Sequence, residues 1–158
     1  MPVWGRLAKG TPKVSPNTIP NANTSANIMD LNLQYAAGVK TMTYWARVRS
    51  RNGRGIYNMQ VTFLNVGPTE GLTQEEIQRG FYPKPSLDKH DVQLRCGCTN
   101  YRFRFDKANR FNRAGTGARF PAYHRKTNRK PNNPDNIPGF CGHLLTLIEY
   151  LQKQGFIF

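Results

Sequence analysis

All three cysteines of the chain, together with one histidine, lie in two short motifs whose side chains are metal ligands. The motif Cys96-Gly97-Cys98 is followed, after a spacer of 42 residues (99–140), by the motif Cys141-Gly142-His143. Three thiolates and one imidazole supply the four ligands of a closed tetrahedral zinc site. A catalytic zinc keeps one position open for water or substrate, and four protein ligands leave none. The motifs therefore predict a zinc ion with a structural role.

The spacing within each motif indicates where it lies in the fold. Residues i and i+2 of a strand point to the same face, so Cys96 and Cys98 are expected at a strand end, with Gly97 allowing a tight turn between them. On a helix, i and i+2 diverge, so Cys141 and His143 converge only if Cys141 lies at or just before the first turn. There the positive end of the helix dipole also favours a thiolate.

The cysteines have two other interpretations, as unrelated buried small side chains or as a disulfide. An odd number of cysteines does not suit a disulfide framework. A disulfide within Cys-x-Cys would close a small, strained ring. Zinc is the better interpretation.

The sequence contains no recognisable catalytic pattern. It lacks a Ser-His-Asp arrangement and paired carboxylates, and the run GTGAR at 115–119 is too short for a P-loop. His90 and His124 have no partner at a ligand or triad spacing, so we interpret them as ordinary surface or loop histidines. We expect neither an enzyme nor a small-molecule substrate.

The charge of the chain is strongly positive and unevenly distributed. The 158 residues carry 23 Lys or Arg against 9 Asp or Glu, a formal net charge of +14. Residues 95–130 include eleven Lys or Arg and a single acidic residue, Asp106, which gives a local net charge of +10. Such a block indicates contact with DNA or an acidic protein, and a solvated basic surface is the plainer alternative. The residues predicted to make this contact are Arg110, Arg113, Arg119, Arg125, Lys126, Arg129 and Lys130.

Residues 1–40 are predicted to be an extended N-terminal arm. The stretch 11–27, TPKVSPNTIPNANTSAN, has three prolines and no hydrophobic period, so it cannot bury enough surface to fold alone. A disordered tail and an arm that orders on another subunit are both open. We expect deletion of residues 2–27 to leave zinc content and stability nearly unchanged.

Two features suit an arm that binds a neighbour. Trp4 is a candidate anchor. The alternation of Met29, Leu31, Leu33 and Tyr35 could add a strand to the sheet of another subunit.

Residues 41–158 are predicted to form one zinc-stabilised α+β domain. Alternating apolar residues over 42–48 and 57–63, joined through Asn52-Gly53, predict a β-hairpin with an apolar inside and a basic outside. A further strand is expected over 91–98, carrying the first two ligands on its core side.

Helices are expected on either side of that strand. Thr73 and Glu76 fit the capping box of a short helix that ends near Gly80. The last helix is expected over 141–154, because leucine and isoleucine recur at i, i+3, i+4 and i+7. The apolar end, FIF at 156–158, should dock on the core or on a partner.

The segment between the two motifs is harder to interpret. TNYRFRF at 99–105 alternates aromatic and basic residues, which predicts a strand paired around the first motif. The same aromatic and arginine side chains could instead stack on single-stranded nucleic acid. Residues 109–138, rich in Gly, Asn, Arg, Lys and Pro, predict a long irregular loop.

The surroundings of the protein can also be inferred from composition. No apolar run approaches the ~20 residues of a membrane span. The first residues, MPVWGRLAKG, lack the apolar middle of a signal peptide. We expect no contact with a membrane, and folding in a reducing cytosol where thiolates can hold zinc.

Cys96, Cys98, Cys141 and His143, with their C-x-C and C-x-H spacing and a helix after them, resemble the SWIM zinc-binding module. The runs KPSLDKHDVQLRCGCTNYRFRF, NPDNIPG and CGHLLTLIEYL are similar to SWIM-like proteins encoded in tailed-bacteriophage genomes, which are virion structural components. The resemblance covers residues 84–151 approximately.

The resemblance implies a virion location and a role between larger capsid, neck or tail subunits, after synthesis in the host cytoplasm. The alternative is a zinc-dependent nucleic-acid-binding module, as SWIM modules elsewhere are thought to be. Packaged DNA is a polyanion too, so non-specific contact with DNA suits either role.

Overall fold

A computed structural model describes residues 3–14, 28–50, 55–121 and 132–158 of the chain. Within them, a four-stranded antiparallel sheet in the order β1-β2-β3-β4 is accompanied by helices of 5 to 12 residues. The elements are α1 (Trp4–Val14), β1 (Ile28–Ala36), β2 (Thr41–Arg49), β3 (Ile56–Phe63), α3 (Gln74–Gln78), β4 (Val92–Cys96), α4 (Thr99–Arg104), α5 (Asp106–Phe111) and α6 (Gly142–Lys153). The predicted α+β class is confirmed.

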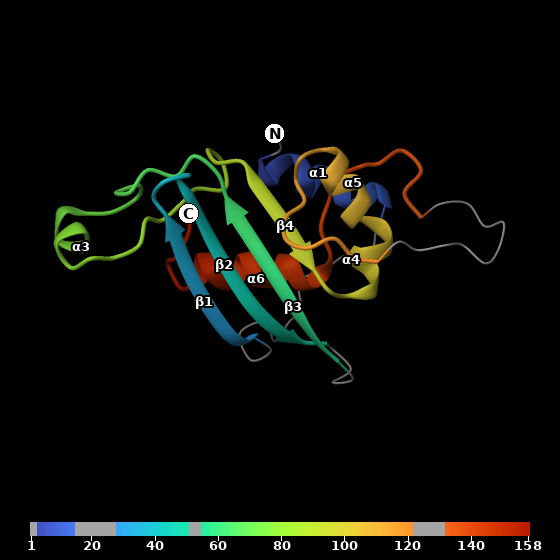
Figure 1. Cartoon of the computed structure of the whole chain (residues 1–158), viewed down its shortest axis with the longest axis horizontal. Coiled ribbons are helices and arrows are strands. Elements are labelled where there is room, and N and C mark those ends of the chain that lie inside the picture. The colour runs from blue at the N-terminus through green and yellow to red at the C-terminus, as the bar shows by residue number, and fades with distance from the viewer. Residues whose placement is uncertain (1–2, 15–27, 51–54, 122–131) are drawn as a thin grey trace.

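The sheet packs one face on the core because its strands alternate apolar and polar side chains. Tyr44, Val61 and Leu94 stand side by side on β2, β3 and β4, and all three are fully buried. α6 crosses behind this face in Figure 1, so the viewer sees the opposite side of the sheet. That side bears the exposed Trp45 and Arg47. The predicted hairpin, apolar inside and basic outside, is confirmed.

α6 and the C-terminal residues after it close the core. The predicted stripe of α6 is buried, and it consists of Leu144, Leu147, Ile148 and Leu151. Each such side chain contributes about 1.5–3 kcal/mol by leaving water. Beyond the helix, the Phe158 N–H donates to the Pro85 carbonyl and the Leu87 N–H to the Phe158 carbonyl, both at 2.9 Å. The C-terminal end therefore docks on its own domain.

The strand expected to join a neighbouring subunit lies in the chain's own sheet. β1 pairs antiparallel with β2, with Leu33 opposite Tyr44. Leu31 and Leu33 are partly buried against the core, and the Tyr35 hydroxyl donates to the Val66 carbonyl at 2.7 Å. The prediction of a partner strand is wrong because only residues 37–40 separate β1 from β2, and so short a loop costs little entropy to close.

The first described segment of the predicted arm is also part of the domain. α1 buries Leu7 completely, and the Trp4 ring stacks on Phe140 with ring centroids 4.1 Å apart. The Thr11 Oγ1 accepts a hydrogen bond from the Phe140 N–H at 3.1 Å. The expectation that residues 1–40 have no fold of their own is therefore wrong for 3–14 and 28–36. Most of the proline-containing stretch, 15–27, lies outside the described residues.

The run TNYRFRF forms α4, and the predicted strand at 99–105 is wrong. The Cys98 Sγ accepts a hydrogen bond from the Tyr101 N–H at 3.4 Å, as an N-cap residue does. Tyr101 and Phe105 are fully buried while Phe103 is 37% exposed. Alternating aromatics at i, i+2 and i+4 contain an i, i+4 pair, which a helix can also bury once its first turn is capped.

The remaining elements follow the sequence more closely. Thr73 and Glu76 form the predicted capping box at the start of α3, and Gly80 has a φ of +74°. The predicted loop at 109–138 begins inside α5, and its residues 122–131 lie outside the described part. No helix in the described part combines the length and apolar character that a membrane span requires.

Candidate metal centre

The end of β4 and the start of α6 bring the four predicted ligands together. The ligand atoms of Cys96, Cys98, Cys141 and His143 all lie within 4.8 Å of one another. The three cysteines are free thiols and are buried, and His143 is partly exposed. Ligands around one zinc ion with Zn–S near ~2.3 Å stand about 3.8 Å apart. The cluster could hold a metal ion after a small contraction.

Three of the four candidate ligands occupy the kind of position that their spacing predicted, whereas Cys98 lies beyond the end of the strand predicted to carry it. Cys96 is the last residue of β4, where it lies opposite Met59 of β3, and Cys98 is the N-cap of α4. Cys141 is the N-cap of α6 and has extended backbone angles, so His143 lies in the first turn. The predicted strand end and helix start are confirmed.

Gly97 does not have the conformational role expected of it. Its φ is outside the left-handed region, and its N–H donates to the Asn58 carbonyl at 3.0 Å. A Cβ added there would lie 3.7 Å from the Asn58 carbonyl oxygen, an ordinary van der Waals distance. Alanine would therefore fit between the two cysteines.

The chemistry of the four groups fits a bound metal. The Nδ1 of His143 is buried and has no hydrogen-bond partner among the described residues. A buried nitrogen without a partner is destabilising by about 1–3 kcal/mol, and a metal bond to it would remove that penalty. The Tyr57 ring, with its centroid 5.2 Å from that of the imidazole, packs beside it.

The protonation of the three thiols depends on their burial. Without a metal ion, burial raises the pKa of both Cys96 and Cys141 well above the ordinary value. Hydrogen bonds from Cys141 and then Cys96 lower the pKa of Cys98. Without a metal, the Cys98 thiolate thus accepts hydrogen bonds from the thiols of Cys96 and Cys141. A metal that binds all three sulfurs as thiolates must displace the protons of those two thiols. Affinity for the metal therefore falls as the pH falls.

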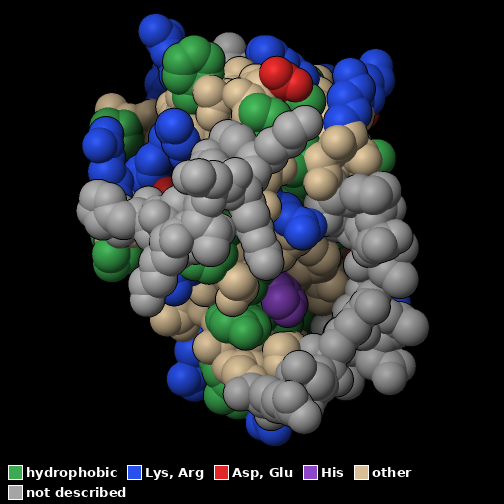
Figure 2. Space-filling view, turned by 90° about the vertical axis from the view of Figure 1, so that its right-hand side faces the viewer, with side chains coloured by type: hydrophobic (Ala, Val, Ile, Leu, Met, Phe, Trp, Pro, Cys, Tyr) green, Lys and Arg blue, Asp and Glu red, His purple; other side chains and the backbone are tan. Residues whose placement is uncertain are grey.

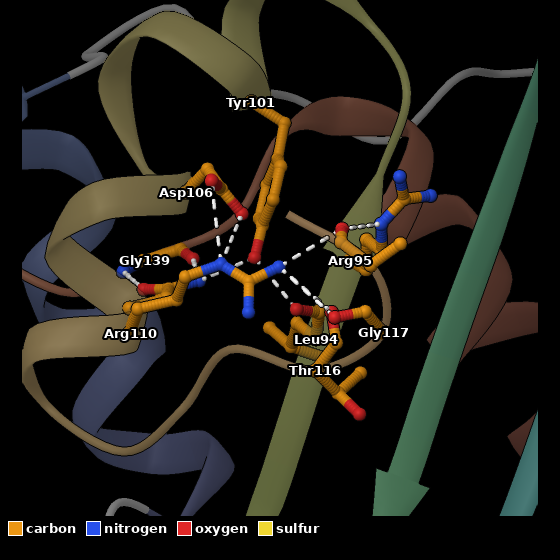
Figure 3. A network of polar contacts seen from close by, with 10 residues as sticks. Leu94, Arg95, Tyr101, Asp106, Arg110, Thr116, Gly117 and Gly139 are labelled. Carbon is orange, nitrogen blue, oxygen red and sulfur yellow. Dashed lines mark hydrogen bonds and ion pairs between the residues drawn. The ribbon is translucent and has the colours of Figure 1, made fainter. Parts of the chain in front are cut away.

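A buried polar network supports the backbone that leads into the second motif (Figure 3). The Asn109 side chain, fully buried, donates to the Gly139 carbonyl at 2.8 Å and accepts from the Gly139 N–H at 2.9 Å. It also donates to the Tyr101 hydroxyl at 3.1 Å, which in turn donates to the Leu94 carbonyl at 2.7 Å. The network thus joins β4, α4 and α5 to the residues just before Cys141.

Replacing Asn109 with alanine is expected to lower the free energy of unfolding by roughly 3 kcal/mol. The change removes three hydrogen bonds, those to the Gly139 N–H, the Gly139 carbonyl and the Tyr101 hydroxyl, and each contributes about 1 kcal/mol or more. The Tyr101 hydroxyl keeps its bond to the Leu94 carbonyl. Denaturant unfolding of the metal-bound protein measures the loss. Lys107→Ala, an exposed change on the same helix, is the control. Equal denaturant midpoints for Asn109→Ala and Lys107→Ala would contradict the stabilising role of the Asn109 hydrogen bonds.

The basic residues predicted to touch a partner have different surroundings. Figure 2 shows many lysine and arginine side chains and few acidic ones on the end of the molecule that carries α1, α4 and α5. Arg113 and Arg119 are exposed. Arg110 is partly buried, and it donates to Asp106 and to the carbonyls of 116–118 (Figure 3), so it holds the loop after α5. Arg125, Lys126, Arg129 and Lys130 lie outside the described residues.

Two arginines beyond that predicted set make a distinctive contact. The guanidinium carbons of Arg95 and Arg102 lie 4.1 and 5.0 Å from the ring centroid of Phe120. The interleaving of aromatic and basic residues in the sequence was a signal for such stacking. The turn between β4 and α4 decides which arginine lies against which aromatic ring. The alternation of aromatic and basic residues in the sequence does not predict that turn.

His90 is a buried loop histidine, and its side chain contacts Ser86 and Glu70. It is 5% exposed, its Nδ1 accepts from the Ser86 N–H at 3.0 Å, and its Nε2 lies 3.2 Å from a Glu70 carboxylate oxygen. These contacts tie the linker before β4 to the turn before α3. His124 lies outside the described residues.

Comparison with protein-family models, with curated proteins and with solved structures gave no match to this chain. The metal centre is therefore argued from its own geometry. The likeness of residues 84–151 to the SWIM module remains a prediction of the sequence.

Proposed function

We propose that the protein is a non-catalytic structural component of a tailed-phage particle, stabilised by a single zinc ion. The observation that carries the proposal is the buried group of three thiols and one imidazole at the junction of β4 and α6. Four protein ligands leave no open position for a substrate, so the metal would hold the structure together. The resemblance of the two motifs to SWIM-like virion proteins supports the location.

Zinc is the metal that suits these ligands. Thiolates with an imidazole in a tetrahedral arrangement are typical of zinc, whereas magnesium, calcium and manganese prefer oxygen ligands. Cys96 and Cys98 would hold the ion from the sheet, and Cys141 and His143 from the helix. The ion would thereby tie together both ends of the 42-residue spacer (99–140). That spacer contains most of the basic block.

The test of the particle role is mass spectrometry of purified phage particles from the source of this sequence. The proposal predicts this chain at a constant copy number per particle through successive steps of purification. A copy number that falls toward zero on purification would overturn the particle role and leave the metal centre untouched. Zinc analysis of the isolated chain tests the metal separately.

A zinc-dependent nucleic-acid-binding module is the second candidate. The observation that favours it is the placement of Arg95 and Arg102, neither of which pairs with a carboxylate among the described residues. For a particle protein we expect the basic surface to bind nucleic acid weakly, in a salt-sensitive way and without sequence preference. Strong discrimination of one sequence at ~0.15 M salt would favour the second candidate.

A further inference from the structure

The sheet has one face that no helix covers in the described part of the chain. α6 lies across the other face, and Figure 1 looks directly onto this one. We call it the open face. The strand register places Asn32, Trp45, Gln60 and Arg95 in one row across it, from β1 to β4. Trp45 and Arg95 are two strands apart, about 10 Å.

Trp45 is unusual on this face. Its neighbours across the strands are the amides of Asn32 and Gln60, and the next row holds Thr43 and Thr62, whose hydroxyls lie 3.1 Å apart. Tryptophan in a sheet normally buries its ring in the core, yet 36% of Trp45 is exposed among these polar groups. The two threonines are buried, and the Gln60 amide donates to the Thr62 and Thr116 hydroxyls at 3.4 and 3.5 Å. The ring therefore offers a flat, exposed aromatic surface beside the amides of Asn32 and Gln60.

One border of the open face is basic. The Arg95 Nε donates to the Ala118 carbonyl at 2.8 Å, which holds its guanidinium beside Phe120. Arg102 reaches the same ring from α4. Two cations on one aromatic ring repel each other, and no carboxylate pairs with either within the described residues. An anion bound between them would relieve the repulsion.

The sheet itself has almost no negative charge to oppose such an anion. Asp30 is the one carboxylate in the four strands, and its Oδ2 accepts from the Arg47 Nε at 2.6 Å. Arg49 adds a further exposed cation at the end of β2. The open face is thus positive around an exposed aromatic ring.

We propose that single-stranded nucleic acid binds across the open face, with an unpaired base stacked on Trp45 and phosphates beside Arg95 and Arg102. Sequence-tolerant binding of single strands combines these same two elements, a stacking ring and a basic track. A duplex keeps its bases stacked on one another and would present only phosphates. An acidic peptide would pair with the arginines but leave the ring and the row of amides without a role.

Tryptophan fluorescence gives a direct test, because the chain has only two tryptophans. Trp4 is 9% exposed and stacked on Phe140, so its emission reports folding, whereas Trp45 lies in the proposed site. A short single-stranded oligothymidylate is expected to quench the emission of the intact protein. Trp45→Phe should remove most of the quenching and keep binding, since a ring remains. Trp45→Ala should weaken binding about tenfold or more at unchanged zinc content.

The arginines are tested through the salt dependence of the same binding. Replacing both Arg95 and Arg102 with glutamine should reduce the slope of log affinity against log salt by about 1.4, since each single-strand phosphate contact contributes about 0.7. Exposed Lys107→Gln on α5 is the control for lost charge and should change the slope less. An unchanged slope in the double variant would overturn the assignment of the phosphate contacts.

Three outcomes would overturn the stacking proposal. One is equal affinity of Trp45→Ala and the intact protein, which would leave charge alone as the source of binding. Another is equal affinity for a duplex of the same length. The third is polyglutamate that binds as tightly and quenches as strongly, which would indicate an acidic protein partner. All three outcomes are measured on the purified chain, so they test the stacking proposal independently of the proposed role in a particle.

Discussion

Replacing Cys141 with serine is expected to abolish zinc binding and to remove the cooperative unfolding transition of the domain. The site exists only when β4 and α6 are in place, so the free energy of metal binding is also free energy of folding. Structural zinc in small domains contributes about 10–16 kcal/mol in apparent terms, as much as the whole stability of a typical domain. Without the metal, three thiols and the unpartnered His143 nitrogen would remain buried.

The measurement combines metal analysis with thermal melting followed by circular dichroism. The intact protein should carry one zinc ion per chain, and Cys98→Ser should behave like Cys141→Ser. Gly97→Ala is the matched control, because its added Cβ meets only an ordinary contact distance to Asn58. A serine variant that melts like the intact protein would show that the cluster does not depend on metal. So would well-folded intact protein with less than half an ion per chain.

The cluster of four candidate metal ligands could be predicted from the sequence because the information for it is local. The types Cys, Cys, Cys and His limit the chemistry, and the i, i+2 spacing limits each pair to a strand end or a helix start. The β2–β3 hairpin and α6 were predictable for a similar reason. Their apolar residues repeat at periods of 2 and 3.6, and those residues are the ones buried.

The role of the N-terminal segment could not be predicted, because its partners lie far away in the chain. Thr11 bonds to Phe140, 129 residues later, and no periodicity links the two. Proline and polar residues dominate the stretch around Thr11, and that composition indicated an arm. The tertiary contacts of a few residues, chiefly Trp4 and Leu7, stabilise this segment on the domain despite its polar, proline-containing composition.

The error at 99–105 has a different cause. Aromatic residues at every second position satisfied a strand pattern, yet Tyr101 and Phe105 alone are buried. The deciding contact is the hydrogen bond from the Tyr101 N–H to the Cys98 sulfur, which caps a helix at a residue that is also a candidate metal ligand. A ligand that also caps a helix was not foreseeable from either pattern taken separately.

α1 also packs on the backbone just before the second motif, and this packing couples the first residues of the chain to the metal centre. A Cβ on Gly10 would come within 2.4 Å of the Pro138 carbonyl oxygen, and one on Gly139 within 2.7 Å of the Thr11 Oγ1. Only glycine lets the two backbones approach so closely. The segment 138–140, the three residues before Cys141, is thus held between α1 and the Asn109 side chain.

Removing residues 3–14, or replacing Trp4 with alanine, is therefore expected to destabilise the domain and to weaken zinc binding. This is the reverse of the sequence-based expectation that loss of the N-terminal residues is harmless. Trp4→Ala should lower the free energy of unfolding by about 3–5 kcal/mol, because it removes the indole ring that stacks on Phe140. The corresponding fall in melting temperature is about 10 °C.

Removal of the whole helix should have a larger effect than Trp4→Ala, since Leu7 and the Thr11 hydrogen bond to Phe140 are lost as well. Gly5→Ala is the matched control: Gly5 lies on the exposed side of α1, where an added Cβ meets nothing within 4 Å, and alanine favours the helix by about 1 kcal/mol. Melting temperature and zinc affinity should then fall together in the truncated chain and in Trp4→Ala, and neither should fall in Gly5→Ala. A truncated chain that melted and bound zinc like the intact protein would show that α1 rests on the domain without supporting the approach to Cys141.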